Sequence, residues 1–306
     1  MNNSGSLDYS LLLNMKLNIG KRKIAVVVLL LVTACFFFCR KSSEIKGVEL
    51  EVSFSESPLS DMLITDVQYR WKTKKNFAGI DQKCHIFVHF WHRNNLILYD
   101  NHVPEIPIPQ WEPDKEYVYS RRIYIPSFID ASDPEFKGEE TIKLSIGFAF
   151  PSGSPGKPLR KVFERKIKFM TPPSDTPEII YENGWYDFEI NPEDFLKRWR
   201  WTGKEARCFI DNPYRDALLV IRGGVSSKAV SGQKVIFRLN DKLLDEFIPE
   251  KRNFEKSYNI KKGMLGKEAK FYLVIAVDKT FIPAQVIPGS KEERELGIKI
   301  SFIYFR

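Results

Sequence analysis

The chain has 306 residues, about twice the length of a typical domain, so two domains are expected. Hydrophobic residues make up 43% of the chain and charged residues 28%, a balance typical of globular proteins that excludes wholesale disorder. The chain has only 4 cysteines, too few for a disulfide scaffold, and its 13% aromatic content favours β-rich packing.

The net charge of +8 is concentrated at the amino-terminal end. Residues 1–41 hold six lysines and arginines against Asp8 alone, which is more than half of the excess. The remainder contains no long basic run of the kind that binds phosphate backbones. We therefore expect no nucleic-acid partner.

Residues 24–39 form a run of 16 residues without a charge, between Lys21-Arg22-Lys23 and Arg40-Lys41. As a helix this run would be about 24 Å long, shorter than a bilayer core of about 30 Å, but the flanking cationic side chains can extend outward to the headgroups. The pattern predicts an uncleaved anchor in a bacterial cell membrane, with residues 1–23 in the cytoplasm and residues 42–306 exported.

A lipoprotein signal is the alternative interpretation of the same segment. Val32-Thr33-Ala34-Cys35 resembles a bacterial lipobox, and a start at Met15 would give a basic region followed by an apolar one. Cys35 would then carry the lipid. The run Phe36-Phe37-Phe38 favours the anchor instead, because the residues after a lipidated cysteine are normally polar.

The exported part begins with a polar segment, residues 42–65, which we interpret as a stalk. Residues 66–170 then hold short β-prone runs separated by turns, a pattern typical of a β-sandwich. The predicted strands are residues 84–91, 96–99, 117–125, 141–148 and 161–169.

Residues 171–177 contain three prolines in seven positions and predict a linker. Residues 178–306 predict a second β-sandwich of jelly-roll type, with Asn191-Pro192-Glu193-Asp194 as the start of a short helix that ends near Trp199. The predicted fold is thus all-β, with two β-sandwich domains of jelly-roll or immunoglobulin-like type after an N-terminal membrane-anchoring helix. The strands predicted in the second domain are residues 218–222, 233–239, 271–277 and 298–304.

Sequence motifs of catalysis are missing. The chain has no GxSxG, no Walker loop, no HExxH, no CxxC and no GxGxxG. We therefore expect no enzymatic activity and no cofactor. A hydrolase built from carboxylates that are distant in the sequence is the third choice.

The histidines cluster in one short part of the first predicted domain and suggest a metal site. In a strand, His85 and His89 would point to the same face, and His102 with Asp100 would approach from the neighbouring strand. Three imidazoles and a carboxylate could hold zinc. Phe87 lies on the same face, which favours histidines packed among aromatic rings over a metal site.

Several short motifs occur in the two halves: Phe87-Val88-His89-Phe90, Asp100-Asn101-His102-Val103-Pro104, Trp111-Glu112-Pro113, Leu144-Ser145-Ile146-Gly147-Phe148, Gly184-Trp185, residues 200–206, Phe281-Ile282-Pro283 and residues 294–298. With these motifs, both halves resemble accessory domains of bacterial glycan machinery. Residues 66–170 are similar to a β-sandwich domain of unknown function that accompanies membrane glycosyltransferases and polysaccharide-export proteins, and residues 178–306 resemble a jelly-roll module found beside glycosyltransferases of surface-glycan synthesis. The resemblance implies a role in surface polysaccharide without catalysis, because no glycosyltransferase catalytic domain is present.

Tryptophans and charged residues gather around the short helix predicted in the second domain. Aromatic faces stack on sugar rings, and neighbouring charged groups hydrogen-bond hydroxyls, so this group is our candidate glycan site. The other interpretation is that the tryptophans fill the core and that Arg200 and Glu205 form a structural ion pair. The candidate residues are Trp185, Trp199, Arg200, Trp201, Lys204 and Glu205.

These observations predict a non-catalytic, membrane-anchored envelope protein. Its second domain would bind glycan in the synthesis or export of surface polysaccharide, and its first domain would act as a spacer or dock onto envelope proteins. The alternative is a structural or assembly subunit of an envelope complex, which would bind protein partners through strand edges and loops. The expected partners are therefore the membrane, an envelope polysaccharide and envelope proteins.

Overall fold

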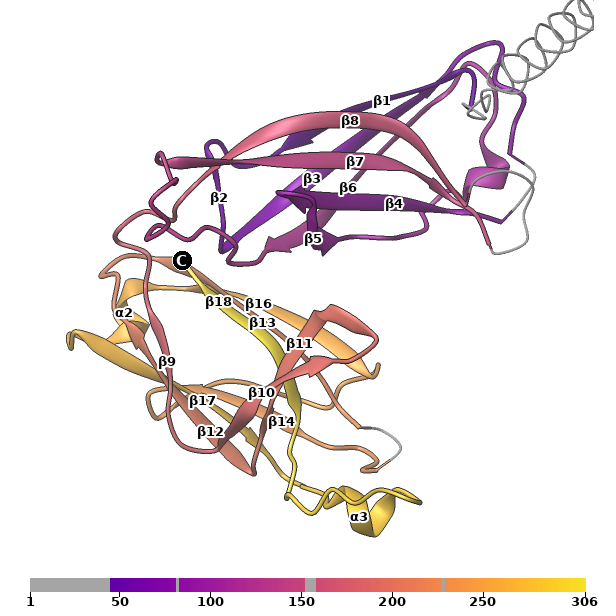
Figure 1. Ribbon diagram of the computed structural model, residues 1–306. Coiled ribbons are helices and arrows are strands. Elements are labelled where there is room, and N and C mark those ends of the chain that lie inside the picture. Colours follow the sequence, from indigo (N-terminus) through magenta and orange to yellow (C-terminus); the bar gives the residue numbers. More distant parts are fainter. Residues whose placement is uncertain (1–44, 81–82, 152–157, 227–228) are drawn as a thin grey trace, which may run out of the picture.

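The computed structural model describes residues 45–306 apart from 81–82, 152–157 and 227–228. The predicted anchor and Cys35 lie outside the described residues. Within the described part, no helix is long and apolar enough to cross a membrane. Four β-sheets make up most of this part, and its helices are short: η1 (Ile108–Gln110), α2 (Lys262–Leu265) and α3 (Pro283–Val286) (Figure 1).

Two sheets pack face to face to form the first sandwich. They share one hydrophobic core, to which one sheet contributes Tyr69 and Trp71 and the other contributes Phe90, Phe148 and Phe169. The first sheet has the order β1 (Val48–Phe54), β3 (Leu63–Thr73), β6 (Glu116–Ile125). The second has the order β2 (Leu59–Ser60), β8 (Leu159–Met170), β7 (Glu139–Ala149), β4 (His85–His92), β5 (Asn95–Tyr99).

The interpretation of residues 42–65 as a stalk is wrong for most of that segment. Strand β1 pairs with β3 in antiparallel register, from Val48 opposite Thr73 to Phe54 opposite Val67. The physical reason is an alternation of apolar and acidic residues in VELEVSF, which places Val52 in the core and keeps the glutamates outside.

The second sandwich is built from two five-stranded sheets. Apart from the hairpins β10–β11 and β14–β15, consecutive strands cross from one sheet to the other, so that strands distant in the chain become neighbours. One sheet has the order β10 (Trp185–Asn191), β11 (Asp194–Thr202), β18 (Lys299–Phe305), β13 (Ala217–Gly224), β16 (Asn253–Ile260). The other has the order β15 (Lys242–Phe247), β14 (Val235–Leu239), β17 (Lys270–Val277), β12 (Glu205–Asp211), β9 (Ile179–Tyr181).

The predicted helix from Asn191 to Trp199 is a β-hairpin instead. Strands β10 and β11 pair directly, with Asn191 opposite Asp194 and a two-residue turn at Pro192-Glu193. The backbone N–H of Glu193 donates to Asn191 Oδ1 at 2.8 Å. An asparagine followed by proline can close such a turn as well as cap a helix, so the local sequence fits both structures.

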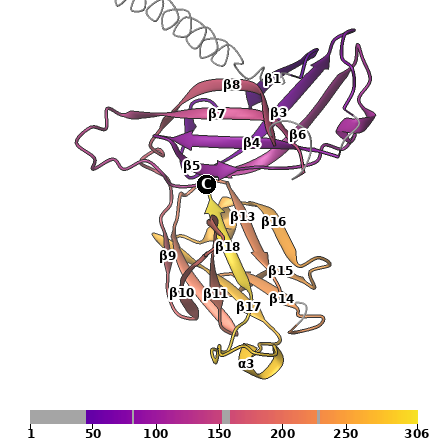
Figure 2. The same ribbon diagram turned by 45° about the vertical axis from the view of Figure 1, so that its right-hand side comes forward.

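The two sandwiches contact each other directly. Ile64 of β3 packs with Val220 and Tyr304 of the second sandwich, and Tyr124 stacks on Phe302 with ring centroids 4.4 Å apart. The carboxyl end of β18 lies at this junction in both views (Figures 1 and 2). Residues 171–177, all of them described, join the sandwiches without a helix or strand of their own.

Candidate functional site

A cleft of ≈ 1270 Å³ lies between the two sandwiches. Strand β5 of the first sandwich forms one wall, and the outer face of the sheet that contains β11, β18 and β13 forms the floor. Phe281, Pro283 and Ile287, in and beside α3, close the end that lies away from the junction.

Strand alternation decides which side chains reach this floor. Along β18, Ile300, Ile303 and Phe305 point into the core, whereas Lys299 and Phe302 belong to the outer face. Paired residues of neighbouring strands share a face, so the pairing of Trp201 with Lys299 and of Arg222 with Phe302 places all four in the cleft.

Trp201 lines the cleft but is largely packed. Its side chain is 8% exposed and meets the ring of Phe281 edge-on, with centroids 5.8 Å apart. Leu296 completes this cluster. Trp201 therefore stabilises the floor of the cleft and offers little free surface for stacking.

Trp199 is the more open of the two tryptophans. It is half-buried, and its indole N–H donates to Glu189 Oε2 at 2.9 Å, which fixes the ring in the floor. The ammonium group of Lys299 lies 4.0 Å from the centroid of the Trp199 ring and 4.9 Å from that of Trp201. This arrangement combines an aromatic surface with a cation at one point of the cleft.

Lys299 was not predicted as a site residue. Burial lowers the pKa of its ammonium group, and repulsion by Arg252 lowers it further, while Glu189 opposes the shift. No local motif marks this lysine, because it reaches Trp199 and Trp201 only through the pairing of β18 with β11. The missing information was the pairing of two strands that are about 100 residues apart in the chain.

Arg200 and Trp185 do not join the cleft. Arg200 points to the opposite face from its neighbours, where its guanidinium lies 4.8 Å from the ring of Tyr181 and 5.4 Å from that of Phe188. The indole N–H of Trp185 donates to the backbone oxygen of Arg207 at 2.8 Å. Both belong to an edge of the sandwich, so the predicted cluster of three tryptophans with Arg200 is not formed.

Lys204 and Glu205 also lie outside the cleft lining. Both are exposed, and Glu205 forms an ion pair of 2.5 Å with Arg238 and one of 3.7 Å with Arg207. The predicted pair of Arg200 with Glu205 is wrong, because Glu205 starts the next strand, β12, in the other sheet. Of the six predicted glycan contacts, the cleft contains only Trp199 and Trp201.

The histidines among the four predicted metal ligands lie on opposite faces of one sheet of the first sandwich. His102 pairs with Ile86, a core residue, and so belongs to the inner face of the sheet, whereas His85 and His89 alternate with Ile86 and point outward. Among the described residues, no group of three or more His, Cys, Asp or Glu side chains is placed to hold a metal ion. His89 packs beside Phe87 instead, with ring centroids 4.9 Å apart.

Asp100 and His102 belong to a closed polar network. Arg121 donates to both oxygens of Asp100 at 2.6 and 2.7 Å, and His102 Nε2 lies 2.8 Å from the hydroxyl of Tyr119. Burial alone would raise the pKa of Asp100, but hydrogen bonds from His102 and Arg121 outweigh it and lower the pKa to about 2. The network ties β6 to the segment after β5.

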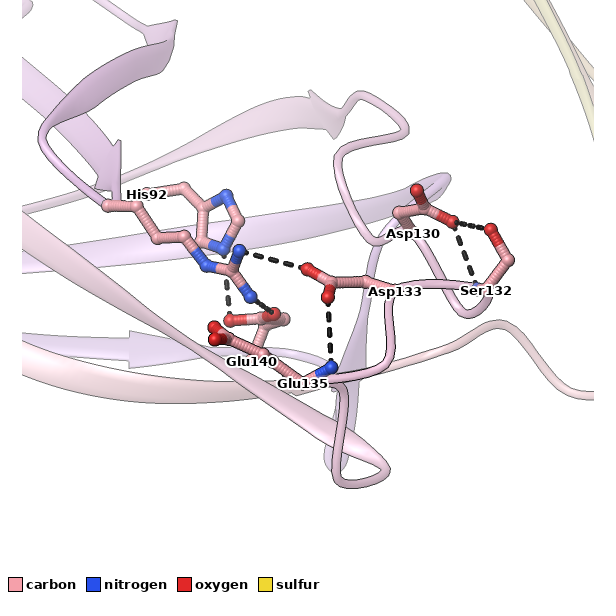
Figure 3. A network of polar contacts seen from close by, with 7 residues as sticks. His92, Asp130, Ser132, Asp133, Glu135 and Glu140 are labelled. Atoms are coloured by element: carbon pink, nitrogen blue, oxygen red, sulfur yellow. Dashed lines mark hydrogen bonds and ion pairs between the residues drawn. The ribbon is translucent and has the colours of Figure 1, made fainter.

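His92 takes part in a second network, near the turn between β4 and β5 (Figure 3). Its Nε2 lies 3.0 Å from Glu140 Oε2, and Arg93 bridges Glu140 at 2.7 Å and Asp133 at 3.0 Å. These contacts fasten the loop around Asp133 to β4 and β7. His92 and Arg93 both meet carboxylate partners, which is consistent with a structural role for this network.

Comparisons with known proteins add little to this description. No protein-family model and no curated protein matches the sequence. Three solved structures are distantly similar: the secreted serine protease VesC from Vibrio cholerae (11% identity, TM-score 0.25, covering 84% of this chain and 51% of that one), carbohydrate-binding modules from the β-sandwich superfamily (10%, 0.26, 86% and 99%), and the collagen adhesin from S. aureus (8%, 0.19, 87% and 99%). The chain spans about half the length of VesC. These TM-scores are too low to carry an argument about fold or function.

Proposed function

We propose that this chain is a non-catalytic glycan-binding protein of the bacterial cell envelope, which binds its glycan in the cleft between the two sandwiches. The observation that carries the proposal is the lining of this cleft, where Trp199, Lys299 and Asn253 lie on one wide floor. The predicted apolar anchor and the resemblance of both halves to accessory domains of glycan machinery support a place in the synthesis or export of surface polysaccharide. A lipid on Cys35 remains the alternative means of attachment.

The size and composition of the cleft suit a segment of a polymer. Its volume of ≈ 1270 Å³ exceeds the range of roughly 300–1,000 Å³ that is common for small-molecule sites. Aromatic rings provide surfaces for the apolar faces of sugars, and amide, hydroxyl and charged groups can hydrogen-bond the hydroxyls. A polysaccharide could lie along the floor from the junction towards α3.

The charges of the lining favour binding without hydrolysis. Glycoside hydrolysis ordinarily requires two carboxyl groups on either side of the scissile bond. Among the described residues that line the cleft, Glu178 is the single acid. The proposed role is therefore recognition or guidance of a glycan.

An assembly role is the second candidate, and it rests on the hairpin of β10 and β11. Phe195 is 70% exposed, and Phe188 and Ile190 are each 47% exposed. Exposed apolar side chains grouped on one hairpin are typical of surfaces that bind another protein. On this reading the protein would bind envelope partners through the hairpin and would leave the cleft without a glycan.

A binding assay with the full chain and a panel of neutral and acidic envelope polysaccharides distinguishes the two candidates. We expect the wild-type protein to bind at least one glycan and Trp199→Ala to lose that binding, because the more open of the two cleft tryptophans is removed. Trp91→Ala is the matched control, since Trp91 is a half-buried tryptophan of the first sandwich outside the cleft lining.

Two results would contradict the glycan proposal: no binding to any member of the panel, or equal binding by Trp199→Ala and the wild type. The assembly role predicts that Phe195→Ser releases envelope proteins that are cross-linked to the wild-type chain in cells. The same change should leave glycan binding unaffected, because Phe195 is outside the cleft lining.

A further inference from the structure

The charged residues of the cleft are almost all basic. The lining contains one acid, Glu178, and five cations: Lys197, Arg198, Arg222, Arg252 and Lys299. Two of these cations have carboxylate partners, because Lys197 lies 3.0 Å from Asp194 and Arg222 lies 2.5 Å from Glu255. For Arg198, Arg252 and Lys299, no carboxylate of the described residues lies within ion-pair distance.

Lys299 is the most informative of these three cations. It is half-buried against two tryptophan rings, where an ammonium group has lost part of its hydration. The nearby carboxylate of Glu189 is already engaged, because one oxygen accepts from the Trp199 indole at 2.9 Å and the other from Arg294 at 2.7 Å. Within the part of the chain that the structure describes, the ammonium of Lys299 therefore has contacts with aromatic rings and no carboxylate partner.

A second cation lies on the same side of the floor. Gly224 pairs with Lys299 on one side and with Asn253 on the other, so residues 299, 224 and 253 form one row across three strands, and Arg252 precedes this row. A Cβ at Gly224 would lie 2.9 Å from Asn253 Oδ1 and 3.0 Å from the backbone oxygen of Arg252. The glycine thus allows this polar segment to approach the floor closely.

The two cations repel each other, and that repulsion contributes to the lowered pKa of Lys299. A fold gains nothing from holding two like charges together on a partly dry surface. A bound anion would offset both the repulsion and the lost hydration. The arrangement is what a site for a negatively charged group requires.

We propose that the ligand of this cleft is an acidic polysaccharide, bound with the carboxylate of a uronic acid unit at Lys299 and Arg252 and with the ring of that unit on Trp199. The inference rests on the proposed glycan-binding function and adds the chemical class of the glycan. A uronic acid carries its carboxylate on the edge of the sugar ring, so one unit presents an apolar face and an anion side by side. The floor presents their complements at one place: the Lys299 ammonium lies over one face of Trp199, 4.0 Å from the ring centroid, and the sugar ring would contact the part of the indole that the ammonium leaves open.

The test measures binding of the full chain to a panel of uronic acid polymers, each paired with the same polymer after reduction of its carboxyl groups to neutral alcohols. We expect the acidic member of at least one pair to bind about tenfold tighter than its neutral counterpart. The preference should decrease as the salt concentration rises, because exposed charges are screened.

Two variants and one control locate the charge that matters. Lys299→Met should abolish the preference for the acidic member, and Arg252→Gln, at an exposed position, should reduce it without risk to the core. Lys204→Met removes the same charge outside the cleft and should retain the preference.

The outcomes separate this inference from the function beneath it. Equal binding of both members of every pair, or binding of neutral glycans alone, would overturn the acidic ligand and leave glycan binding intact. Tighter binding of a phosphodiester-linked glycan than of any uronic acid polymer would overturn the carboxylate. Failure to bind any glycan would overturn both proposals. If Lys299→Met still preferred the acidic polymer, the proposed contact between Lys299 and the carboxylate would be wrong, and the lysine would only cover the tryptophan rings.

Discussion

Two regions of this molecule hold a partly buried cation, and they do so in opposite ways. In the first sandwich, Arg121 binds both oxygens of Asp100, and His102 joins them to the hydroxyl of Tyr119. In the cleft, Lys299 rests on Trp199 and has no carboxylate within ion-pair distance among the described residues. In the first arrangement the cation already has a carboxylate partner. In the second, the cation could still bind an anion.

The difference indicates how a structural site and a binding site can be told apart without homologous sequences. A network whose charges are all satisfied stabilises the fold and has nothing left to offer a ligand. A half-buried charge without a partner costs stability, and such a cost is typical of functional sites. By this criterion the polar network around Asp100 fits a structural role, and the unpaired cation in the cleft fits the binding site that we propose.

Replacement of Trp201 should give the largest effect on stability. We expect Trp201→Ala to lower the free energy of unfolding by about 3–5 kcal/mol, because it leaves a cavity against Phe281 and Leu296. Urea denaturation monitored by circular dichroism would measure the loss. A loss below about 1 kcal/mol would mean that Trp201 is a free stacking surface, contrary to its 8% exposure.

The second largest effect on stability is expected in the polar network of Asp100 and Arg121. We expect Asp100→Asn to lower the free energy of unfolding by about 1.5–3 kcal/mol at neutral pH, since Arg121 would lose a charged partner. Arg122→Gln is the control, because its pair with Asp66 is exposed and should matter by less than about 1 kcal/mol. If Asp100→Asn left the free energy of unfolding unchanged, the contrast between the two regions would disappear.

The same carboxyl group gives a pH dependence. The pKa of Asp100 is about 2 in the folded protein, below its ordinary value of 3.8, so its contribution to stability is present above pH 3.8 and is lost as the pH falls towards 2. The stability difference between the wild type and Asp100→Asn should therefore shrink over this interval. Urea unfolding at pH 7, 4 and 3 measures it, and a difference that grows on acidification would contradict the assigned pairing.

Lys299→Met should change stability little, although it is expected to abolish the preference for acidic glycan. The variant loses a cation–π contact and regains the cost of burying an ammonium group, so the free energy of unfolding should stay within about 1 kcal/mol of the wild-type value. A loss above about 2 kcal/mol would place Lys299 in the structural class with Arg121.

The smallest effect is expected for Glu205, which was predicted to contact the glycan. Glu205→Ala breaks exposed ion pairs with Arg238 and Arg207, so stability should fall by less than about 1 kcal/mol. Glycan binding should be unchanged. Weaker binding by this variant would return the site to the residues proposed from the sequence.

The sequence predicted the sheets better than the site. Apolar runs and turn residues located β13, β14, β17 and β18, because a buried strand needs such residues wherever it pairs. The segment Asn191-Pro192-Glu193-Asp194 was misread because its turn chemistry also fits a helix start. The error carried into the site, since a helix would have gathered Trp199, Arg200 and Trp201, whereas a strand sends them alternately to opposite faces.

Lys299 could not have been found by the same reasoning. Its role depends on the pairing of the last strand with a hairpin far earlier in the chain, and on a first sandwich that supplies the opposite wall. Short motifs report local conformation, and they do not report which strands become neighbours. The cleft is a property of the topology, so it emerged only with the fold.

The central claim, that glycan binds on the floor of this cleft, is tested most directly by ¹⁹F NMR of the full chain labelled with 5-fluorotryptophan. The 6 tryptophans are distributed over both sandwiches, and only Trp199 and Trp201 line the cleft. Titration with an acidic polysaccharide should shift the resonances of these two and leave those of Trp71, Trp91, Trp111 and Trp185 unchanged. Shifts confined to one or more of these other four tryptophans would contradict the claim.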